Sequence, residues 1–362
     1  MTRRDRSVAP SRGNHGLEQR VFGVVRGIDP SRPKGPLVVG FSGGPDSLAL
    51  LLVLSQLWPV IGRELLALHV DHRLRTDSFR DAAAAEQLAR ELGVPMHVER
   101  LEPGLASRHP GVGIEEAARR ERYRAAAVFC RVVGGSFVTG HHADDQAETV
   151  LLHLLRGSGL AGAGGMRTVT RLTIPWWEPA PLFGTTSLTV VRPLLETRRR
   201  ELASYVALRR PDLIPVLDPS NQSDRYRRNA IRQHVLPEVE RAFPASVESL
   251  NRFARIAAEE SDLLDVIAGT ALIAATDPTR RLSRSALAAQ PVAIARRVLR
   301  GWLLAVIPGV ELTLERVEAL RELAGSDGTH WSVEVGEGYS VRSEGDLLTV
   351  RPAPSCGGVQ YR

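Results

Sequence analysis

Lysine is nearly missing from this chain of 362 residues, in which Lys34 is the only lysine among 47 lysine and arginine side chains. Arginine therefore carries the basic charge, and the formal net charge is +6. A planar guanidinium suits the oxygens of phosphate groups, so a polyanionic partner such as RNA is one explanation. A GC-rich genome that encodes arginine wherever lysine would serve explains the same composition, and the counts alone do not decide between the two.

Cysteine and long apolar runs are also scarce. Cys130 and Cys356 are far apart and form no CxxC pair, which argues against a disulfide framework, a zinc ribbon or an iron–sulfur site. No apolar run approaches the roughly 20 residues that cross a membrane. Residues 1–16 are basic and polar with no apolar segment behind them, unlike a secretory signal. We therefore expect a cytoplasmic protein without a membrane partner, whose residues 1–16 form a disordered basic tail.

Short apolar runs alternate with longer helical patterns from Leu37 to about Arg210. Strands are expected at 37–41, 65–70, 95–101 and 136–140, with helices at 46–57, 81–93, 113–134 and 143–157. Repeated strand–helix units predict an α/β fold with a doubly wound, mainly parallel, Rossmann-like sheet. Residues 157–188 are expected to be irregular, before a strand at 188–195.

A change of pattern near Pro244 predicts a second domain. Residues 245–325 are rich in alanine and leucine with helical spacing, and residues 331–352 alternate as strands of a hairpin do. We therefore predict a catalytic domain over residues 17–240. A smaller, mainly helical domain that ends in a short β hairpin is predicted over 241–362.

The hexapeptide SGGPDS follows the first predicted strand and opens a helix. In this context backbone N–H groups and the helix dipole hold an anion. The glycines allow close backbone approach, the serines offer hydroxyl groups, and the aspartate can cap the helix or hold Mg²⁺. The hexapeptide matches neither the lysine-containing GxxxxGK[ST] loop nor the pattern GxGxxG. The candidate nucleotide-binding residues are Ser42, Gly43, Gly44, Pro45, Asp46 and Ser47.

This hexapeptide resembles the PP-loop of ATP pyrophosphatases. The resemblance implies that ATP is cleaved between its α and β phosphates and that the loop holds the released pyrophosphate. A bare pair of glycines would instead be explained by an ordinary strand–helix turn. The full hexapeptide in this setting favours the nucleotide site.

Two more predicted strands end in polar residues. Asp71 and His72 follow the second strand, and such ends face one crevice in a doubly wound sheet. The pair His69 and His72 has the spacing of zinc ligands, but alternation along a strand and the lack of nearby cysteines disfavour zinc. His69 is better explained as a buried strand-end histidine.

The segment ADDQAET follows the fourth strand. Asp145 and Glu148 are spaced i, i+3 and so share one helix face, while Asp144 is expected to be the N-cap. The carboxylate pair could cap the helix at a solvated face, or bind a metal or another cation. Its expected closeness to the glycine loop and Asp71 favours a cationic co-substrate.

In the segment GIEEAARRERYRAA, Glu115, Arg119 and Arg122 lie on about one helical stripe. An ion-paired surface helix is the ordinary explanation of such a pattern.

Six segments, in this order, resemble bacterial tRNA(Ile)-lysidine synthetases: FSGGPDS, HVDHRLR, GIEEAARRERY, GHHADDQAETVLLHLLRGSG, VRPLL and DPSNQSDRYRRNAIRQHVLPEVE. The resemblance runs from about Leu37 to Pro244. It implies a two-step reaction, in which ATP adenylates C2 of the wobble cytidine of CAU-anticodon tRNA(Ile). L-lysine then displaces AMP to form lysidine, which changes decoding from Met to Ile.

The same resemblance implies roles for particular residues. Asp145 and Glu148 would bind the lysine amines, and Asp71 or His72 would orient or deprotonate the nucleophile. Asp46 is the candidate Mg²⁺ ligand. The expected contacts to the target nucleotide and the tRNA backbone are Arg119, Arg122, Arg225, Arg227, Arg228 and Arg232. The oligomeric state is not fixed by the sequence, and a homodimer is one state that it allows.

Residues 172–188 depart from this family's pattern. They include Trp176 and Trp177 and fit a lid, a tRNA stacking surface or a simple insertion. A tRNA thiolase shares the loop, but it needs a catalytic cysteine or a cluster-binding CxxC set. If the chain were a small-molecule ligase, the basic segment RYRRNAIRQH would have no explanation. If it were a binding module with a degenerate loop, the intact loop and carboxylates would have none.

Overall fold

The computed structural model describes residues 12–28, 35–175, 186–216, 227–307, 309–328 and 330–352. The described chain forms two compact units, the first comprising residues up to 175 and 186–258, the second residues from 259 onward. Trp176, Trp177 and Arg225 lie outside the described residues. None of the described helices combines the length and the apolar character that a membrane crossing needs.

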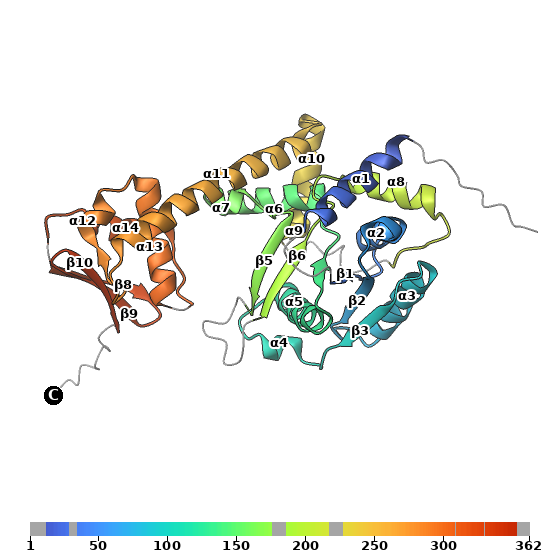
Figure 1. The fold of residues 1–362 in the computed structure, drawn as a ribbon, viewed down its shortest axis with the longest axis horizontal. Helices are drawn as coiled ribbons and strands as arrows, with labels where there is room; N and C mark the ends of the chain where they lie inside the picture. Colours follow the sequence, from blue (N-terminus) through green and yellow to red (C-terminus); the bar gives the residue numbers. More distant parts are fainter. Residues whose placement is uncertain are drawn as a thin grey trace, which may run out of the picture. The chain divides into compact units, whose positions relative to one another are not determined.

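A six-stranded sheet with the order β3-β2-β1-β4-β6-β5 forms the centre of the first unit (Figure 1). Its strands are β1 (Leu37–Gly40), β2 (Leu65–Asp71), β3 (Met96–Arg100), β4 (Ser136–Val138), β5 (Val169–Ile174) and β6 (Thr186–Val191). Neighbouring strands from β3 to β6 are parallel, whereas β5 is antiparallel to β6. The predicted doubly wound, mainly parallel sheet is confirmed.

The strand β5 corrects one expectation, because it lies within the stretch 157–188 that we expected to be irregular. It is an edge strand whose residues alternate between exposed and half-buried up to Ile174. Its sequence, VTRLTI, alternates and is rich in β-branched residues, so propensity favours a strand here, and it pairs antiparallel with β6.

The helices of this unit cover the sheet. They are α1 (Arg12–Arg26), α2 (Pro45–Ile61), α3 (Ser78–Glu91), α4 (Leu105–Arg108), α5 (Ile114–Val133), α6 (Ala143–Leu155), α7 (Leu160–Ala163), α8 (Arg199–Arg209), α9 (Arg227–Ala230) and α10 (Leu236–Ala242), with a π-helical turn, η2, at Ile231–Val235. Residues 12–16, which we assigned to the basic tail, begin α1. The helix α11 (Ser246–Ala275) runs from the first unit into the second.

The main core explains how the glycine loop is held. Every side chain of α2 from Leu48 to Leu54 is fully buried, which is the pattern of a helix that is apolar on all sides. α1, α3 and α8 share this core with β1 and β2. α5 packs instead against β4 and β6. The start of α2 is therefore fixed in position where β1 ends.

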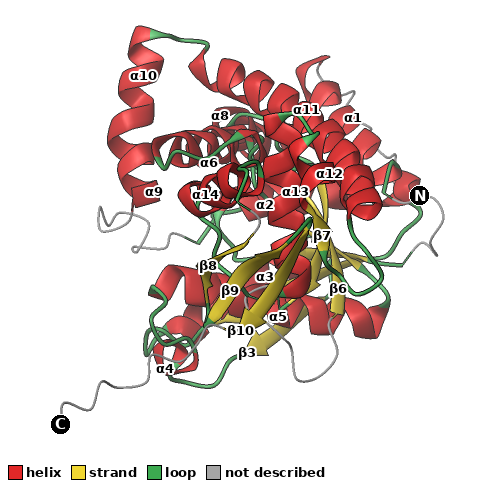
Figure 2. Ribbon diagram, turned by 90° about the vertical axis from the view of Figure 1, so that its left-hand side faces the viewer, coloured by secondary structure: helices red, strands yellow, loops and turns green. Residues whose placement is uncertain are grey.

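The second unit combines helices with a small antiparallel sheet (Figure 2). Its elements are β7 (Leu282–Ser283), α12 (Arg284–Ala288), α13 (Val292–Val306), α14 (Leu314–Ala324), β8 (His330–Gly336), β9 (Tyr339–Glu344) and β10 (Leu347–Pro352). The sheet order is β7-β10-β9-β8. The alternation at 331–352 thus forms three strands, to which β7 adds a short fourth. Trp302 is buried in this unit's core and donates its indole N–H to the carbonyl of Arg280 at 2.8 Å.

Candidate active site

The glycine loop turns sharply between β1 and α2. Gly43 has φ of 78°, and a Cβ there would lie 2.8 Å from Cγ2 of Val216. Gly140, after β4, comes so close that its Cβ would lie 3.0 Å from the carbonyl oxygen of Asp46. Both positions therefore require glycine, one for its backbone angle and both for close approach.

The start of α2 is suited to an anion. Gly44 is the N-cap and Pro45 the first helical residue, and no side chain in the described chain caps this end. The hydroxyl groups of Ser42 and Ser47 are 3.2 Å apart, and Ser47 also donates to the carbonyl of Gly44 at 3.0 Å. Uncapped N–H groups at the positive end of the helix dipole, with hydroxyls beside them, can bind phosphate oxygens.

Asp46 lies between His142 and Arg199 without a short hydrogen bond to either. Its Oδ2 is 3.6 Å from Nε2 of His142, and its Oδ1 is 3.6 Å from Nε of Arg199. Among the described residues no three His, Cys, Asp or Glu side chains gather as metal ligands would. Mg²⁺ needs no such cage, because one carboxylate together with substrate phosphates commonly holds it. Asp46 thus fits as a ligand of nucleotide-bound Mg²⁺.

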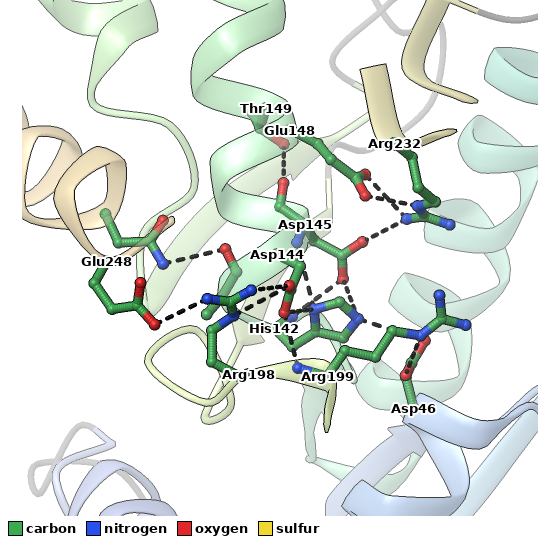
Figure 3. Close-up of polar contacts among 12 residues, drawn as sticks. Asp46, His142, Asp144, Asp145, Glu148, Thr149, Arg198, Arg199, Arg232 and Glu248 are labelled. Atoms are coloured by element: carbon green, nitrogen blue, oxygen red, sulfur yellow. Dashed lines mark hydrogen bonds and ion pairs between the residues drawn. The ribbon is translucent and has the colours of Figure 1, made fainter. Parts of the chain in front are cut away.

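His142 links the glycine loop to α6, as Figure 3 shows. It is 1% exposed and is the N-cap of α6. The backbone N–H of Asp145 donates to Nδ1 of His142 at 3.3 Å, and the N–H of His142 donates to Oδ2 of Asp145 at 3.1 Å. Burial disfavours the charged imidazole, but the carboxylates of Asp46, Asp145 and Asp144 outweigh it and raise the pKa of His142.

The expectation that Asp144 caps α6 is wrong, because His142 is the N-cap and the helix begins two residues earlier than that assignment required. The carboxylate of Asp144 instead accepts the backbone N–H of Arg199, at the start of α8, at 2.8 Å. It also pairs with Arg198 at 3.0 Å, and Arg198 contacts Glu240 at 2.6 Å and Glu248 at 2.9 Å. Arg198 thereby joins α6, α8, α10 and α11.

Asp145 and Glu148 lie on one face of α6, as their spacing predicts, and both are buried. Arg232 donates from Nε to Glu148 at 2.6 Å and from a terminal nitrogen to Asp145 at 2.9 Å (Figure 3). Arg228 contacts the same two carboxylates at 2.9 Å and 3.2 Å. The pair therefore binds cationic groups, and in the free chain two arginines supply them.

Charge at this cluster shifts the neighbouring groups. Burial alone would raise the pKa of Asp145, but His142, Arg228 and other positive groups lower it overall. Burial opposes the charge of Arg232, yet its hydrogen bond to Glu148 raises the pKa of Arg232. The ion pairs in this cluster thus favour the charged forms of Asp145 and Arg232.

Asp71 is the last residue of β2, and His72 follows it. Both therefore lie at the carboxyl ends of the parallel strands, where β1 leads into the glycine loop. Oδ1 of Asp71, which is buried, accepts the backbone N–H of Arg73 at 2.9 Å and so holds the following turn. Nδ1 of His72 is buried with no partner among the described residues. Burial first, and then the charge of Arg122, lower the pKa of His72 to about 4. His72 is therefore neutral at neutral pH.

His69 has the structural role that we predicted. Its Nδ1 lies 2.9 Å from the carbonyl oxygen of Phe41, and the side chain is buried. A ring nitrogen that is satisfied by a backbone carbonyl explains the residue without a metal.

A second neutral histidine follows β4. Burial, then the charges of Arg192 and Arg228, lower the pKa of His141 to about 3, although Asp145 opposes them. Its Nδ1 lies 2.8 Å from Oγ1 of Thr139. The positive charges of Arg192, which follows β6, and of Arg228, in α9, thus reach this histidine against the opposing charge of Asp145.

The predicted nucleotide-contacting arginines do not lie in one group. Arg119 is exposed, pairs with Glu116 at 3.4 Å and lies over the ring of Tyr123. Arg122 is exposed, and its charge reaches both His72 and His141. Arg227 is exposed, whereas Arg228 and Arg232 face the buried carboxylates, described above.

Sequence reasoning missed His142, Arg198 and Arg199 as parts of the site. His142 lies in the quoted GHHADDQAET segment, and histidine is not among the preferred N-cap residues. The arginines belong to the run RRR at 198–200, which resembles any charged surface. Only contacts across more than 50 residues, such as Arg198 to Asp144, distinguish them.

The strand, uncapped glycine loop and buried helix, placed in a mainly parallel sheet, define a protein of the PP-loop class. In agreement, residues 18–239 match the family described as PP-loop domain, and residues 282–348 match the TilS substrate binding domain. The chain belongs to the tRNA(Ile)-lysidine synthase family.

Relatives with that name support the assignment. The one from Salinispora tropica is 40% identical and covers 74% of this chain and 76% of its own length. The relative from Pseudomonas aeruginosa is 34% identical, with 89% and 70% covered. The relative from Symbiobacterium thermophilum is 37% identical over 83% of this chain, which spans 62% of that protein.

Among solved structures, the U34-tRNA thiolase NcsA from Methanococcus maripaludis, with its [4Fe-4S] cluster, is similar. It has a TM-score of 0.52 and 18% identity, and the match covers 68% of this chain and 78% of that one. This likeness shows the fold alone.

Proposed function

We propose that this chain, in the cytoplasm, ligates L-lysine to C2 of the wobble cytidine of CAU-anticodon tRNA(Ile), with ATP as the source of energy. One observation carries the proposal: a buried carboxylate pair that binds cations adjoins the glycine loop through His142. The anion site suits a departing pyrophosphate, and the cation site suits the amines of lysine. The names of the relatives support tRNA(Ile) as the nucleic-acid substrate.

In the first step the C2 oxygen attacks the α-phosphorus of ATP, and the bond to the β-phosphate breaks. Pyrophosphate leaves against the N-terminus of α2, where Ser42 and Ser47 add hydroxyl donors. Asp46 would hold the Mg²⁺ that neutralises phosphate charge. The hydroxyl contacts and uncapped N–H groups support this assignment.

In the second step a lysine ammonium group gives one proton to Asp145 or Glu148, and the neutral amine attacks C2 and displaces AMP. Asp145 and Glu148 would position the lysine amines, and their burial strengthens each ionic contact. The attacking nitrogen becomes more acidic as its bond to carbon forms, so a weak neutral base suffices. We assign this role to His72 over Asp71, because Nδ1 of His72 has no described partner whereas Asp71 already accepts a backbone N–H.

The decisive assay incubates the protein with ATP, radiolabelled L-lysine and a transcript of CAU-anticodon tRNA(Ile). We expect ATP-dependent incorporation of label, with release of AMP and pyrophosphate. A transcript of initiator or elongator tRNA(Met) is the matched control. Incorporation without ATP, or equal labelling of tRNA(Met), would contradict the proposal.

A further inference from the structure

The carboxylates that would hold lysine are already occupied in the free chain. Nε of Arg232 donates to Oε1 of Glu148 at 2.6 Å, and Nε of Arg228 donates to Oε2 at 2.9 Å. Terminal nitrogens of both arginines reach the same oxygen of Asp145, at 2.9 Å and 3.2 Å. Two positive and two negative charges therefore cancel at this cluster, which leaves little net charge to attract an ammonium group.

The two sides of the cluster differ in exposure. The side chain of Glu148 is 2% exposed and that of Asp145 11%, whereas each arginine side chain is 30% exposed. The carboxylates are thus covered, and the arginines form the side that faces solvent. A cation from solution has to displace a guanidinium group to reach Glu148, whereas an anion can meet the arginines directly.

Both arginines come from one short stretch at α9 and η2, four residues apart. A π-helical turn such as η2 is often found at functional sites. Guanidinium groups bind carboxylate and phosphate with the same bidentate geometry. The same two side chains can therefore exchange a carboxylate partner for a phosphate of RNA.

We propose that Arg228 and Arg232 compete with L-lysine for Asp145 and Glu148, and that tRNA phosphates draw them away so that lysine binds after the RNA. At the two carboxylates, the two ammonium groups of lysine would take the places of the two guanidinium groups. By linkage, whatever tightens lysine binding when tRNA is bound tightens tRNA binding by the same factor. This inference rests on the function proposed above.

The test measures binding of radiolabelled L-lysine by equilibrium dialysis without tRNA, for the wild type, Arg228→Gln and Arg232→Gln. If the arginines fill the site about nine tenths of the time, lysine binds the wild type roughly tenfold more weakly than an open site. We therefore expect each variant to bind lysine several-fold more tightly. Arg241→Gln is the matched control: it removes the same charge from α10, where Arg241 is exposed and pairs with Glu238, and lysine binding should not change.

A second measurement does not depend on the variants. Adding the CAU-anticodon transcript and a non-hydrolysable ATP analogue should tighten lysine binding to the wild type. The gain should be smaller for Arg228→Gln, in which one competitor is already gone. Thermal unfolding of each variant confirms that it is folded before its affinity is compared.

Unchanged or weaker lysine binding in both folded variants overturns the inference, as does a wild-type affinity for lysine that tRNA does not alter. The proposed function is tested separately by the wild-type incorporation assay. If that assay succeeds while lysine affinity is unmoved by the substitutions, only the competition is rejected. If wild-type incorporation fails, the function itself is rejected.

Discussion

The backbone N–H of Val216 donates a hydrogen bond of 2.9 Å to the carbonyl of Gly43. The two residues are 173 positions apart in the sequence, and their side-chain positions nearly touch: a Cβ on Gly43 would lie 2.8 Å from Cγ2 of Val216. The glycine loop is therefore held from outside the strand–helix unit that contains it. Its shape depends on the segment after α8 as well as on its own glycines.

Substituting Gly43 by alanine should damage the loop in two ways. A positive φ costs an L-residue about 1–2 kcal/mol, and the new methyl group collides with Val216. We expect loss of tRNA-dependent pyrophosphate release together with a lower melting temperature. Pyrophosphate release is measured by a coupled phosphate assay, and stability by thermal unfolding.

Gly62 is the matched control, because its φ is 65° and a Cβ there meets nothing within 4 Å. Gly62→Ala should lower stability by a similar strain energy and leave pyrophosphate release intact. Adding Val216→Ala to Gly43→Ala removes the collision and should recover part of the activity. Equal activity loss in Gly43→Ala and Gly62→Ala would show that general destabilisation, not loop geometry, is responsible.

Asp46→Asn should suppress the first step. The substitution keeps the size of the side chain but removes the charge that faces His142, Arg199 and, by our proposal, Mg²⁺. Losing one such electrostatic contact typically lowers the rate about 100-fold or more. Pyrophosphate release with tRNA and ATP, but without lysine, measures this step alone.

Asp212→Asn is the control for Asp46→Asn, because Asp212 is exposed and pairs only with Arg210 in the described structure. It should release pyrophosphate at the wild-type rate. An Asp46→Asn protein that releases pyrophosphate normally, yet fails to incorporate lysine, would place Asp46 in the second step instead.

Glu148→Gln should affect the second step. Glutamine retains a hydrogen-bonding oxygen but not the charge that holds a cation, and contacts with charged groups contribute about 1.5–3 kcal/mol, or roughly 10- to 100-fold. We expect KM for lysine to rise by that factor while pyrophosphate release changes little. Glu86→Gln, an exposed position on α3, is the control. Equal loss of both steps would reject this division between the carboxylates.

The parts of the site that could be predicted are formed by residues that lie close together in the sequence. The loop 42–47 can be recognised from the order strand, glycine pair and helix, and the shared face of Asp145 and Glu148 from their spacing. The rule that the ends of parallel strands lie side by side also placed Asp71 correctly, at the end of β2 beside β1. In each case the helical spacing or the turn that indicates the feature spans only a few residues.

Contacts between distant segments could not be read in the same way. Arg232 meets Glu148 across 84 residues, and nothing in RYRRNAIRQH states whether an arginine faces RNA or a carboxylate. Asp144 was misassigned because two helices compete for it, and the N-terminus of α8 is the one that it caps.

Two half-buried histidines, His72 and His141, make folding depend on pH in a defined direction. The pKa of His141 is lowered to about 3 and that of His72 to about 4, whereas an unfolded histidine titrates near 6.5. Between those values the unfolded chain binds protons that the folded chain does not. For these two groups unfolding therefore takes up protons, and their contribution to stability rises with pH until about 6.5, above which they are neutral in both states. The raised pKa of His142 acts in the opposite direction.

Replacing His141 by glutamine should remove about one of these protons at pH 5, because the amide does not titrate and can still bond to Thr139. The free energy of unfolding then depends less steeply on pH, by up to about 1.4 kcal/mol per pH unit. Urea unfolding at several pH values between 5 and 6.5 measures both slopes. A variant whose slope equals that of the wild type would show that His141 is protonated in the folded chain, in conflict with its burial among Arg122, Arg192 and Arg228.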